Sequence, residues 1–232
     1  MTSLRPRALL FDVMGTVVDV DGSVHRETTA ALTSAGIRAD DIERVLALSA
    51  DRLGSLMDDV SARRRPWQAH RALRVAAVTD TLASLGLPAL SRELETTIAG
   101  ITNRLTAWPD SVAGLDRLRG SFLTAALSNA DTAELAAMSA SAGLSWHAAI
   151  SAEHAKAFKP DPAVYRLALH LLDVPAEQTL MVAAHPWDLR AAAAHGIATA
   201  FVNRPGAEQP DTPHEFDLTA SDLDHLADQL DL

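Results

Sequence analysis

The chain contains no cysteine among its 232 residues. This absence excludes disulfide bonds, zinc sites built on thiolates and cysteine nucleophiles. Basic residues are also in deficit, because 20 Lys and Arg stand against 30 Asp and Glu, which gives a formal net charge of −10 at pH 7. Such a charge argues against nucleic acid or an anionic membrane surface as the main partner. It does not exclude a small anionic substrate, because a local group of Lys or Arg can set the field in one cleft.

Long apolar runs are missing as well. No stretch of the sequence approaches the roughly 18 apolar residues that a membrane-spanning helix needs. The N-terminal segment "MTSLRPR" is basic, but the apolar run that follows it reaches Asp12 too early for a signal peptide. We therefore expect a soluble, cytoplasmic protein. With 48% hydrophobic residues in 232, the chain is long enough to bury the core of one domain and of a smaller appended unit.

Strand and helix patterns alternate along the second half of the chain. Short apolar runs with polar ends predict strands, and helical periodicity that stops at Gly or Pro predicts the helices between them. The predicted strands are residues 8–13, 122–129, 147–151, 179–184 and, as the last one, 199–203. The predicted helices are residues 108–120, 132–144, 160–175 and 188–197, the last with Asp188 as its N-cap. This alternation predicts an α/β fold with a parallel, doubly wound sheet.

A helical block separates the first predicted strand from the others. Its helices are predicted at residues 25–37, 39–64 and 68–88, with few strand signals between them. We interpret the block as an insertion into the sheet domain. The predicted core domain is residues 1–18 and 105–232, and the predicted all-helical cap domain is residues 19–104.

Two tryptophans lie near the ends of this block, each beside a proline. They are Trp67, after Pro66, and Trp108, before Pro109. Each could line a cleft between the two units or anchor their junction. Their position beside a proline at a domain junction favours anchoring.

Polar residues follow several of the predicted strands. They are Asp12 and Thr16 after the first strand, Ser128 and Asn129 after the second, Lys159 in a later loop, and His185 and Asp188 after "TLMVAA". In parallel sheets, ligands bind at the carboxyl ends of the strands, near the point where the strand order reverses. Each residue also has a structural explanation as a turn, a helix cap or a surface loop residue. Their joint occurrence favours one shared site.

Four motifs carry a resemblance to a known family. They are "FDVMGTVVD", "LSNA", "FKPDPAVY" and "AAHPWDLRAAAAHGIATAFVNRP". With these motifs the chain resembles the haloacid dehalogenase superfamily of hydrolases over nearly its whole length. The resemblance implies that Asp12 is the nucleophile and that Thr16 and Ser128 hold the nucleophile or the acid group of the substrate. It also implies that Lys159 balances negative charge, that Asp188 is the fourth-motif acid, and that the helical insert is a cap closing over the site.

Most members of the resembled superfamily are magnesium-dependent phosphatases, and this chain departs from them at two positions. They carry a second Asp two residues after the nucleophile and a fourth motif resembling Gly-Asp-x-x-x-Asp. Here these positions hold Met14 and Ala184. A thioether cannot serve as a general acid or base, and an alanine side chain offers no ligand atom to a metal. The sequence therefore predicts neither a metal nor a cofactor.

The subgroup that lacks both acids resembles (S)-2-haloacid dehalogenases, whose fourth motif often ends in Trp-Asp, as Trp187 and Asp188 do here. This resemblance implies that Asp12 attacks C2 of a short 2-haloalkanoate, expels halide and forms an ester. Water then hydrolyses the ester to a 2-hydroxy acid. Asp188 and His185 are the candidate bases for that water, and Asn129 is the candidate for positioning the reacting groups.

Met14, Tyr165 and Trp187 are the predicted substrate-binding residues. Tyr165 stands where the dehalogenases have a tyrosine near the nucleophile, although its helical spacing with Leu169 also fits core packing. In the dehalogenases a cap arginine holds the leaving halide, and alignment by eye places Leu48 at that position. The candidates for a displaced arginine are Arg52, Arg63, Arg64 and Arg65.

Three functions are open on the sequence alone. The first is the metal-independent dehalogenase. The second is a magnesium-dependent hydrolase of a small phosphoester or another small acid substrate. The third is an inactive relative used for binding or assembly, which has to explain why Asp12, Thr16, Ser128, Lys159 and Asp188 are all present. Dimers are common among the resembled enzymes, and because the sequence identifies no interface, a homodimer is a further open expectation.

Overall fold

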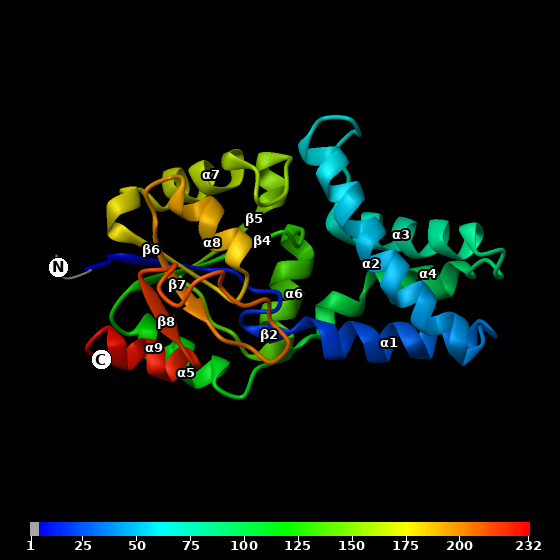
Figure 1. The fold of residues 1–232 in the computed structure, drawn as a ribbon, viewed down its shortest axis with the longest axis horizontal. Helices are drawn as coiled ribbons and strands as arrows, with labels where there is room; N and C mark the ends of the chain where they lie inside the picture. Colours follow the sequence, from blue (N-terminus) through cyan, green and yellow to red (C-terminus); the bar gives the residue numbers. More distant parts are fainter. Residues whose placement is uncertain (1–4) are drawn as a thin grey trace.

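The structure is a computed structural model that describes residues 5–232, so residues 1–4 of the predicted core domain lie outside the described residues. Its centre is a six-stranded parallel sheet with the strand order β5-β4-β1-β6-β7-β8 (Figure 1). The strands are β1 (Ala8–Phe11), β4 (Leu123–Ser128), β5 (Ala148–Ser151), β6 (Thr179–Ala183), β7 (Ala198–Val202) and β8 (Leu218–Ala220).

The strand order reverses at β1. This strand pairs with β4 on one side, where Phe11 is opposite Ala126, and with β6 on the other, where Phe11 is opposite Val182. The chain builds outward from β1 through β4 to β5, and then returns to β6, β7 and β8 on the opposite side. A crevice at the carboxyl ends of β1, β4 and β6 is the expected result. Residues that follow these three strands therefore start from neighbouring positions.

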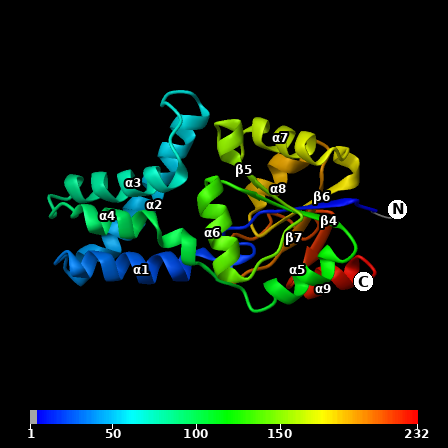
Figure 2. The same ribbon diagram turned by 180° about the vertical axis from the view of Figure 1, so that it is seen from behind.

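Helices cover both faces of the sheet (Figure 2). On one face, α5 (Ser111–Arg119), α6 (Thr132–Ala142) and α9 (Leu223–Gln229) bury Leu9 and Phe11 of β1. On the other face, α7 (Pro162–Leu172) and α8 (Pro186–Ala193) bury Leu10. Successive side chains of a strand point to opposite faces, so the continuous apolar run of β1 fills both halves of the core. The remaining short helices of this part are η2 (Ala152–Ala155) and η3 (Ala176–Gln178).

The helical segment lies between the two strands of a small antiparallel ribbon, β2 (Val18–Asp19) and β3 (Thr106–Ala107). Its elements are α1 (Val20–Ser34), α2 (Ala39–Ser61), α3 (His70–Ser84), α4 (Arg92–Ala99) and η1 (Ile101–Arg104). Both views place α1 to α4 together at one end of the molecule (Figures 1 and 2). They share an apolar core of their own, which includes Leu32, Val45, Leu82 and Ile98. The division into domains at residues 18/19 and 104/105 stays a prediction.

The predicted parallel, doubly wound α/β sheet is confirmed, and two local predictions are wrong. Residues 199–203 are not the last strand, because Leu218–Ala220 adds β8. Three residues with an exposed Thr219 at their centre are too few to produce a readable period. Asp188 is not an N-cap, because α8 begins earlier, at Pro186, with His185 as its N-cap. Proline has the backbone angle of a first helical turn and needs no N–H partner there.

Within residues 5–232, no helix combines the length and the apolar composition that a membrane crossing requires.

Candidate active site

Three charged side chains meet at the carboxyl ends of the central strands. Asp12 follows β1, Lys159 lies in the loop before α7, and Asp188 lies in the first turn of α8; all three are buried. Lys159 Nζ donates hydrogen bonds to Asp12 Oδ1 at 2.7 Å and to Asp188 Oδ2 at 2.5 Å. The Tyr165 hydroxyl, from α7, donates to Asp188 Oδ1 at 2.5 Å. We call Asp12, Thr16, Lys159, Tyr165 and Asp188 the Lys159 cluster.

Two carboxylates share one ammonium group in this cluster, and their pKa values diverge. Burial raises the pKa of Asp12, but the charges of Lys159 and His185 and the hydrogen bonds it accepts outweigh burial, so that its pKa lies below the ordinary value. The pKa of Asp188 is raised, because burial and the charge of Asp12 outweigh Lys159 and Tyr165. The two carboxylates outweigh burial at Lys159 and raise its pKa. Asp12 is therefore ionised beside a protonated Lys159, and Asp188 is the more basic carboxylate.

Thr16 ties the loop after β1 to the loop after β6. Its Oγ1 donates to Asp12 Oδ2 at 2.7 Å and accepts from the backbone N–H of Ala184 at 2.8 Å. The fully buried hydroxyl thus fixes the second carboxylate oxygen, while Lys159 fixes the first. The Asp12 carboxylate is held in one orientation before any substrate enters.

His185 packs against the backbone of the same loop. Its Nε2 lies 3.0 Å from the carbonyl oxygen of Met14 and 3.6 Å from Asp12 Oδ2. A carbonyl oxygen only accepts, so Nε2 carries the hydrogen and Nδ1 is the ring nitrogen that can accept a proton. Gly15 makes this approach possible, because its φ is +86° and a Cβ there would lie 2.7 Å from His185 Nε2. Position 15 therefore requires glycine for two reasons: its positive φ, and the lack of space for a Cβ beside His185.

Trp108 and Arg204 hold the next two carbonyl groups of this loop. Trp108 Nε1 donates to Gly15 O at 3.2 Å, and Arg204 Nε donates to Thr16 O at 2.8 Å. Arg204 is fixed in turn by a bidentate pair with Asp110, at 2.6 and 2.9 Å. The anchoring interpretation of Trp108 is confirmed. The sequence analysis did not predict a role for Arg204, although it belongs to the quoted "FVNRP". The available signal was an arginine two residues after a buried strand.

Ser128 ends β4, and Asn129 follows it. Asn129 Oδ1 accepts from the backbone N–H of Lys159 at 2.7 Å, and its Nδ2 donates to the Lys159 carbonyl at 3.4 Å, so this amide brackets the backbone of Lys159. Ser128 Oγ accepts from Ala130 N at 3.2 Å. Within residues 5–232, the Ser128 hydroxyl forms no hydrogen bond to Asp12.

A cavity of about 310 Å³ lies over Lys159, between the helical segment and the sheet domain. Helix α2 lines it with Gly54, Met57 and Asp58. The sheet domain lines it with Asn129, Lys159, Pro160 and Trp187. Its volume is at the lower end of the range for small-molecule sites. Of the predicted substrate contacts, Trp187 lies on this wall, where its ring stacks on His185 at 5.7 Å between centroids.

The other predicted substrate contacts are placed differently. Tyr165 is fully buried and stacks on His195 at 5.6 Å between ring centroids. Among the described residues its hydroxyl bonds only Asp188, which favours a positioning role over contact with substrate. Met14 packs partly against the core of the sheet domain.

The residues considered for halide binding are also away from the cavity. Leu48 is exposed on α2. Arg64 pairs with Asp59 at 2.8 Å, and Arg52 lies 3.9 Å from Asp80. Among the described residues, no arginine lines the cavity, so Arg52, Arg63, Arg64 and Arg65 are all absent from its wall.

The residues present do not fit a magnesium ion. Mg²⁺ requires near-octahedral oxygen ligands, usually with one or two carboxylates. Met14 and Ala184 supply no side-chain oxygen, and the Lys159 ammonium already pairs with both remaining carboxylates, Asp12 and Asp188. Across residues 5–232, no group of three or more acidic or histidine side chains is arranged to hold a metal.

Comparisons with known proteins agree with this geometry. The family model for haloacid dehalogenase-like hydrolases matches residues 6–196. The (S)-2-haloacid dehalogenase 1 of Pseudomonas sp. (strain CBS-3) is 31% identical over 209 residues, which cover 85% of each chain. The crystal structure of the L-2-haloacid dehalogenase PA0810 has 36% identity and a TM-score of 0.88, covering 97% of this chain and 99% of that one. The defluorinating L-2-haloacid dehalogenase Rha0230 has 30% identity and a TM-score of 0.88, covering 98% and 96%. The chain belongs to the haloacid dehalogenase-like hydrolases.

Proposed function

We propose that this protein is a metal-independent hydrolase that removes halide from short 2-haloalkanoic acids and releases 2-hydroxy acids. The observation that carries the proposal is that the Lys159 ammonium pairs with both buried carboxylates, Asp12 and Asp188, while Met14 and Ala184 stand where magnesium-dependent relatives have acids. The buried Asp12 carboxylate stays ionised there without a metal. Relatives named as (S)-2-haloacid dehalogenases, aligned over 85% of the chain, support the same reaction.

In the first step, an oxygen of Asp12 attacks C2 of the substrate. A carbon–oxygen bond forms, the carbon–halogen bond breaks, and the halide leaves with the bonding electron pair. The leaving group is already an anion and needs no proton, so an uncharged Met14 is compatible with this step. Lys159 and Thr16 hold the carboxylate in one orientation for the attack. We assign the N–H groups of Asn129 and Trp187, both on the cavity wall, to the departing halide in place of the missing arginine.

In the second step, water attacks the carboxyl carbon of Asp12 in the ester. The bond between that carbon and the ester oxygen breaks, and because the ester oxygen came from Asp12, the product carries it away as its hydroxyl. One water proton goes to the product oxygen and the other to a base. Asp188 suits this role because its pKa is raised and it contacts Lys159. His185 is the second candidate, through Nδ1, because its Nε2 donates to the Met14 carbonyl.

The helical segment serves as the cap in this proposal, with the division into domains as predicted: residues 1–18 and 105–232 for the core and 19–104 for the cap. Helix α2 supplies one wall of the cavity with Gly54, Met57 and Asp58. The segment also contacts the loop that carries Lys159, because Ser61 Oγ accepts from Phe158 N at 3.1 Å. Substrate selection therefore depends on α2 and on how it is held over Asp12.

The first experiment measures halide release from chloro-, bromo- and fluoroacetate and from the 2-halopropionates, with and without EDTA. We expect release that EDTA does not affect and that disappears in Asp12→Asn, because an amide of the same shape is a poor nucleophile. Hydrolysis of p-nitrophenyl phosphate with added magnesium is measured alongside. Magnesium-dependent phosphate release without any halide release contradicts the proposal and favours the phosphoester function.

The ester intermediate has a test of its own. A single turnover in H₂¹⁸O, with enzyme in excess over substrate, should place ¹⁸O in the peptide that contains Asp12 and leave the product unlabelled. Label that appears first in the 2-hydroxy acid means that water attacks the substrate directly.

A further inference from the structure

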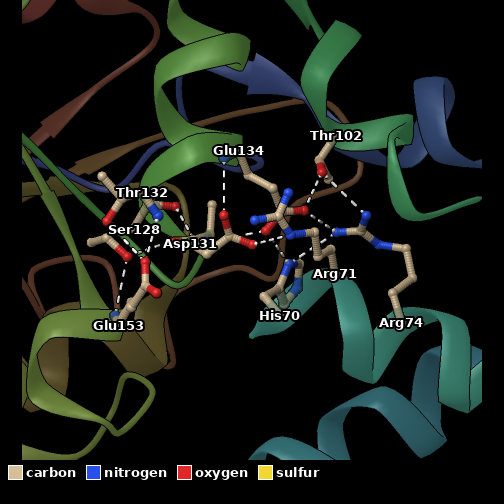
Figure 3. A network of polar contacts seen from close by, with 11 residues as sticks. His70, Arg71, Arg74, Thr102, Ser128, Asp131, Thr132, Glu134 and Glu153 are labelled. Atoms are coloured by element: carbon tan, nitrogen blue, oxygen red, sulfur yellow. Dashed lines mark hydrogen bonds and ion pairs between the residues drawn. The ribbon is translucent and has the colours of Figure 1, made fainter. Parts of the chain in front are cut away.

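A second cluster of buried polar groups joins the helical segment to the sheet domain (Figure 3). It lies outside the Lys159 cluster and takes no part in the proposed chemistry. Helix α3 contributes one end, η1 the middle, and the first turn of α6 the other end. Its members, which we call the α3–α6 cluster, are His70, Arg71, Arg74, Thr102, Asp131 and Glu134.

Glu134 is the acceptor that the cluster shares. Its side chain is fully buried, and its Oε1 accepts from the Thr102 hydroxyl and from Arg74 Nη2, the latter at 3.4 Å. Arg74 also donates to Thr102 Oγ1 at 3.1 Å and to His70 Nδ1 at 2.9 Å. Burial raises the pKa of Glu134, but His70, Arg74 and Thr102 outweigh burial and hold its pKa far below the ordinary value. One carboxylate thus connects α3, η1 and α6.

The same carboxylate reaches the loop of the candidate active site. Glu134 Oε2 accepts from the backbone N–H of Asp131 at 3.1 Å, and Asp131 Oδ1 accepts from Glu134 N at 3.1 Å, which is a reciprocal capping box. Asp131 directly follows the segment Ser128–Ala130, and Figure 3 draws Ser128 and Asp131 in the same view. The loop that carries Asn129 therefore ends at Asp131, whose backbone N–H donates to Glu134.

A second contact between the two units is apolar and lies beside Lys159. Phe158 packs among Leu56 and Val60 of α2 and Leu73 and Ala77 of α3. This contact buries hydrophobic area, but apolar packing alone leaves several arrangements of similar energy. Hydrogen bonds and ion pairs are directional, and a buried charge tolerates no arrangement that leaves it unpaired. The α3–α6 cluster is therefore suited to select one arrangement of the helical segment.

We propose that Glu134 is a positioning residue that fastens α3 and η1 to the first turn of α6, so that α2 forms the wall of the substrate cavity above Lys159. The proposal rests on the proposed function only where it concerns substrate kinetics. Glu134 acts through the placement of α2 and does not contact the substrate.

The kinetic consequence follows from population shift. If the fastened arrangement is the one that binds substrate, weakening it lowers the fraction of competent molecules and raises KM by the reciprocal of that fraction. Saturating substrate draws the segment back into place, so kcat is retained. A carboxylate that only adds stability lowers the melting temperature and leaves KM unchanged at temperatures where the protein is folded.

Glu134→Gln is the direct test, with halide release from 2-chloropropionate as the readout. We expect KM to rise about tenfold while kcat stays within about threefold of wild type. Thr102→Val removes one donor with little change of shape and should shift KM in the same direction by less, which keeps the test open if Glu134→Gln folds poorly. Glu27→Gln is the matched control, because Glu27 accepts from Arg104, which joins α1 to η1, and within residues 5–232 it forms no hydrogen bond to α6. An unchanged KM in both Glu134→Gln and Thr102→Val overturns the proposal, as does a loss of kcat at constant KM.

Hydrogen exchange measured by mass spectrometry tests the same residue without any activity. We expect peptides from residues 70–84 and 101–104 to exchange faster in Glu134→Gln than in wild type, while peptides from β1, β4 and β6 stay unchanged. Exchange equal to wild type in α3 and η1, or a uniform increase that includes the sheet, overturns the proposal. If wild type releases no halide, the proposed function fails by itself and hydrogen exchange alone decides the role of Glu134.

Discussion

Asp188 and Glu134 are alike in their immediate surroundings. Each is fully buried, and each accepts hydrogen bonds from a basic side chain and a hydroxyl: Lys159 and Tyr165 for Asp188, Arg74 and Thr102 for Glu134. Their pKa values nevertheless move in opposite directions, up for Asp188 and down for Glu134. Local hydrogen bonding alone therefore does not explain the difference.

The difference lies in how many carboxylates share the positive charge. Asp188 shares its one ammonium, Lys159, with Asp12. In the α3–α6 cluster, by contrast, two arginines, Arg71 and Arg74, serve the two carboxylates of Asp131 and Glu134. Glu134, which His70, Arg74 and Thr102 face, is therefore held ionised, whereas the pKa of Asp131 in the same cluster is raised, because burial and the charge of Glu134 outweigh the Glu134 backbone N–H and Arg71. We infer that the shortage of cations around Asp188 suits chemistry and that the fully partnered Glu134 suits the joining of structural units.

Replacement of the shared cation should have the largest effect. Lys159→Met leaves Asp12 and Asp188 facing each other without a counter-ion, so we expect kcat/KM to fall by about three orders of magnitude. Breaking a buried pair leaves an uncompensated charge, which should also lower the free energy of unfolding by about 3–5 kcal/mol.

Arg74→Met is the matched variant, since it also removes a buried cation and retains an apolar side chain. It should lose unfolding free energy to a similar degree and raise KM, but keep kcat within about threefold of wild type. Urea unfolding and saturation kinetics on both variants check the contrast. A comparable loss of kcat in the two variants would mean that the clusters do not divide chemistry from attachment.

Replacing each carboxylate by its neutral amide, in Asp188→Asn and Glu134→Gln, should have effects of intermediate size. The two variants should differ in how the free energy of unfolding changes. Because the folded-state pKa of Asp188 is raised, its favourable protonated form is present below its ordinary pKa of 3.8 and lost as pH rises, so the ionised group costs stability at pH 7. Asp188→Asn should therefore keep or raise the unfolding free energy at pH 7, by up to about 1 kcal/mol, while activity falls about a hundredfold with loss of the base.

Glu134→Gln should show the opposite pH dependence. The folded-state pKa of Glu134 is lowered, so its contribution to stability is present above its ordinary value of 4.5 and lost as pH falls through the folded-state pKa. The variant should be less stable than wild type at pH 7, and the gap should narrow below pH 4.5. Urea unfolding of both proteins at pH 7 and again below pH 4.5 measures the difference in unfolding free energy. A gap that does not depend on pH would assign the loss to packing instead of charge.

The two clusters also differ in how far the sequence predicts them. Asp12, Asn129 and Asp188 each follow a strand that the apolar runs identify, Lys159 lies in the loop before a predicted helix, and the strand order brings them together. The motif pattern and the parallel sheet were therefore readable from sequence. The cavity wall was not, because it depends on which face α2 turns toward the sheet domain.

The α3–α6 cluster has no comparable sequence pattern. His70, Arg74 and Glu134 stand at ordinary helical positions, where charged residues are typical of a solvated face. Only the packing of α3 and η1 against α6 buries them, and that packing joins positions 28 to 60 residues apart in the chain. Arg204 escaped prediction for a similar reason, since its partners Thr16 and Asp110 lie 188 and 94 residues away.

The smallest effect should come from Asp58, the only acidic residue that α2 contributes to the cavity wall within the described chain. It adds negative charge opposite a cluster that already holds two carboxylates to one ammonium, and so it opposes an anionic substrate. Asp58→Asn should lower KM for 2-chloropropionate about two- to threefold at low salt, with kcat unchanged. The gain should shrink as ionic strength approaches about 1 M, where the Debye length is roughly 3 Å.

Asp51→Asn is the matched control for this effect. Asp51 is exposed on the same helix, about two turns before Asp58 and so roughly 10 Å farther along the axis, and it is not on the cavity wall. Removing its charge changes the net charge of the protein by the same amount and should leave KM unchanged. A lower KM in both variants would show that the substrate responds to the overall charge of the chain. A lower KM in Asp58→Asn alone would show that the excess of negative charge around Lys159 includes Asp58 on α2. The charge of Asp58 would then be what limits the affinity for the anionic substrate.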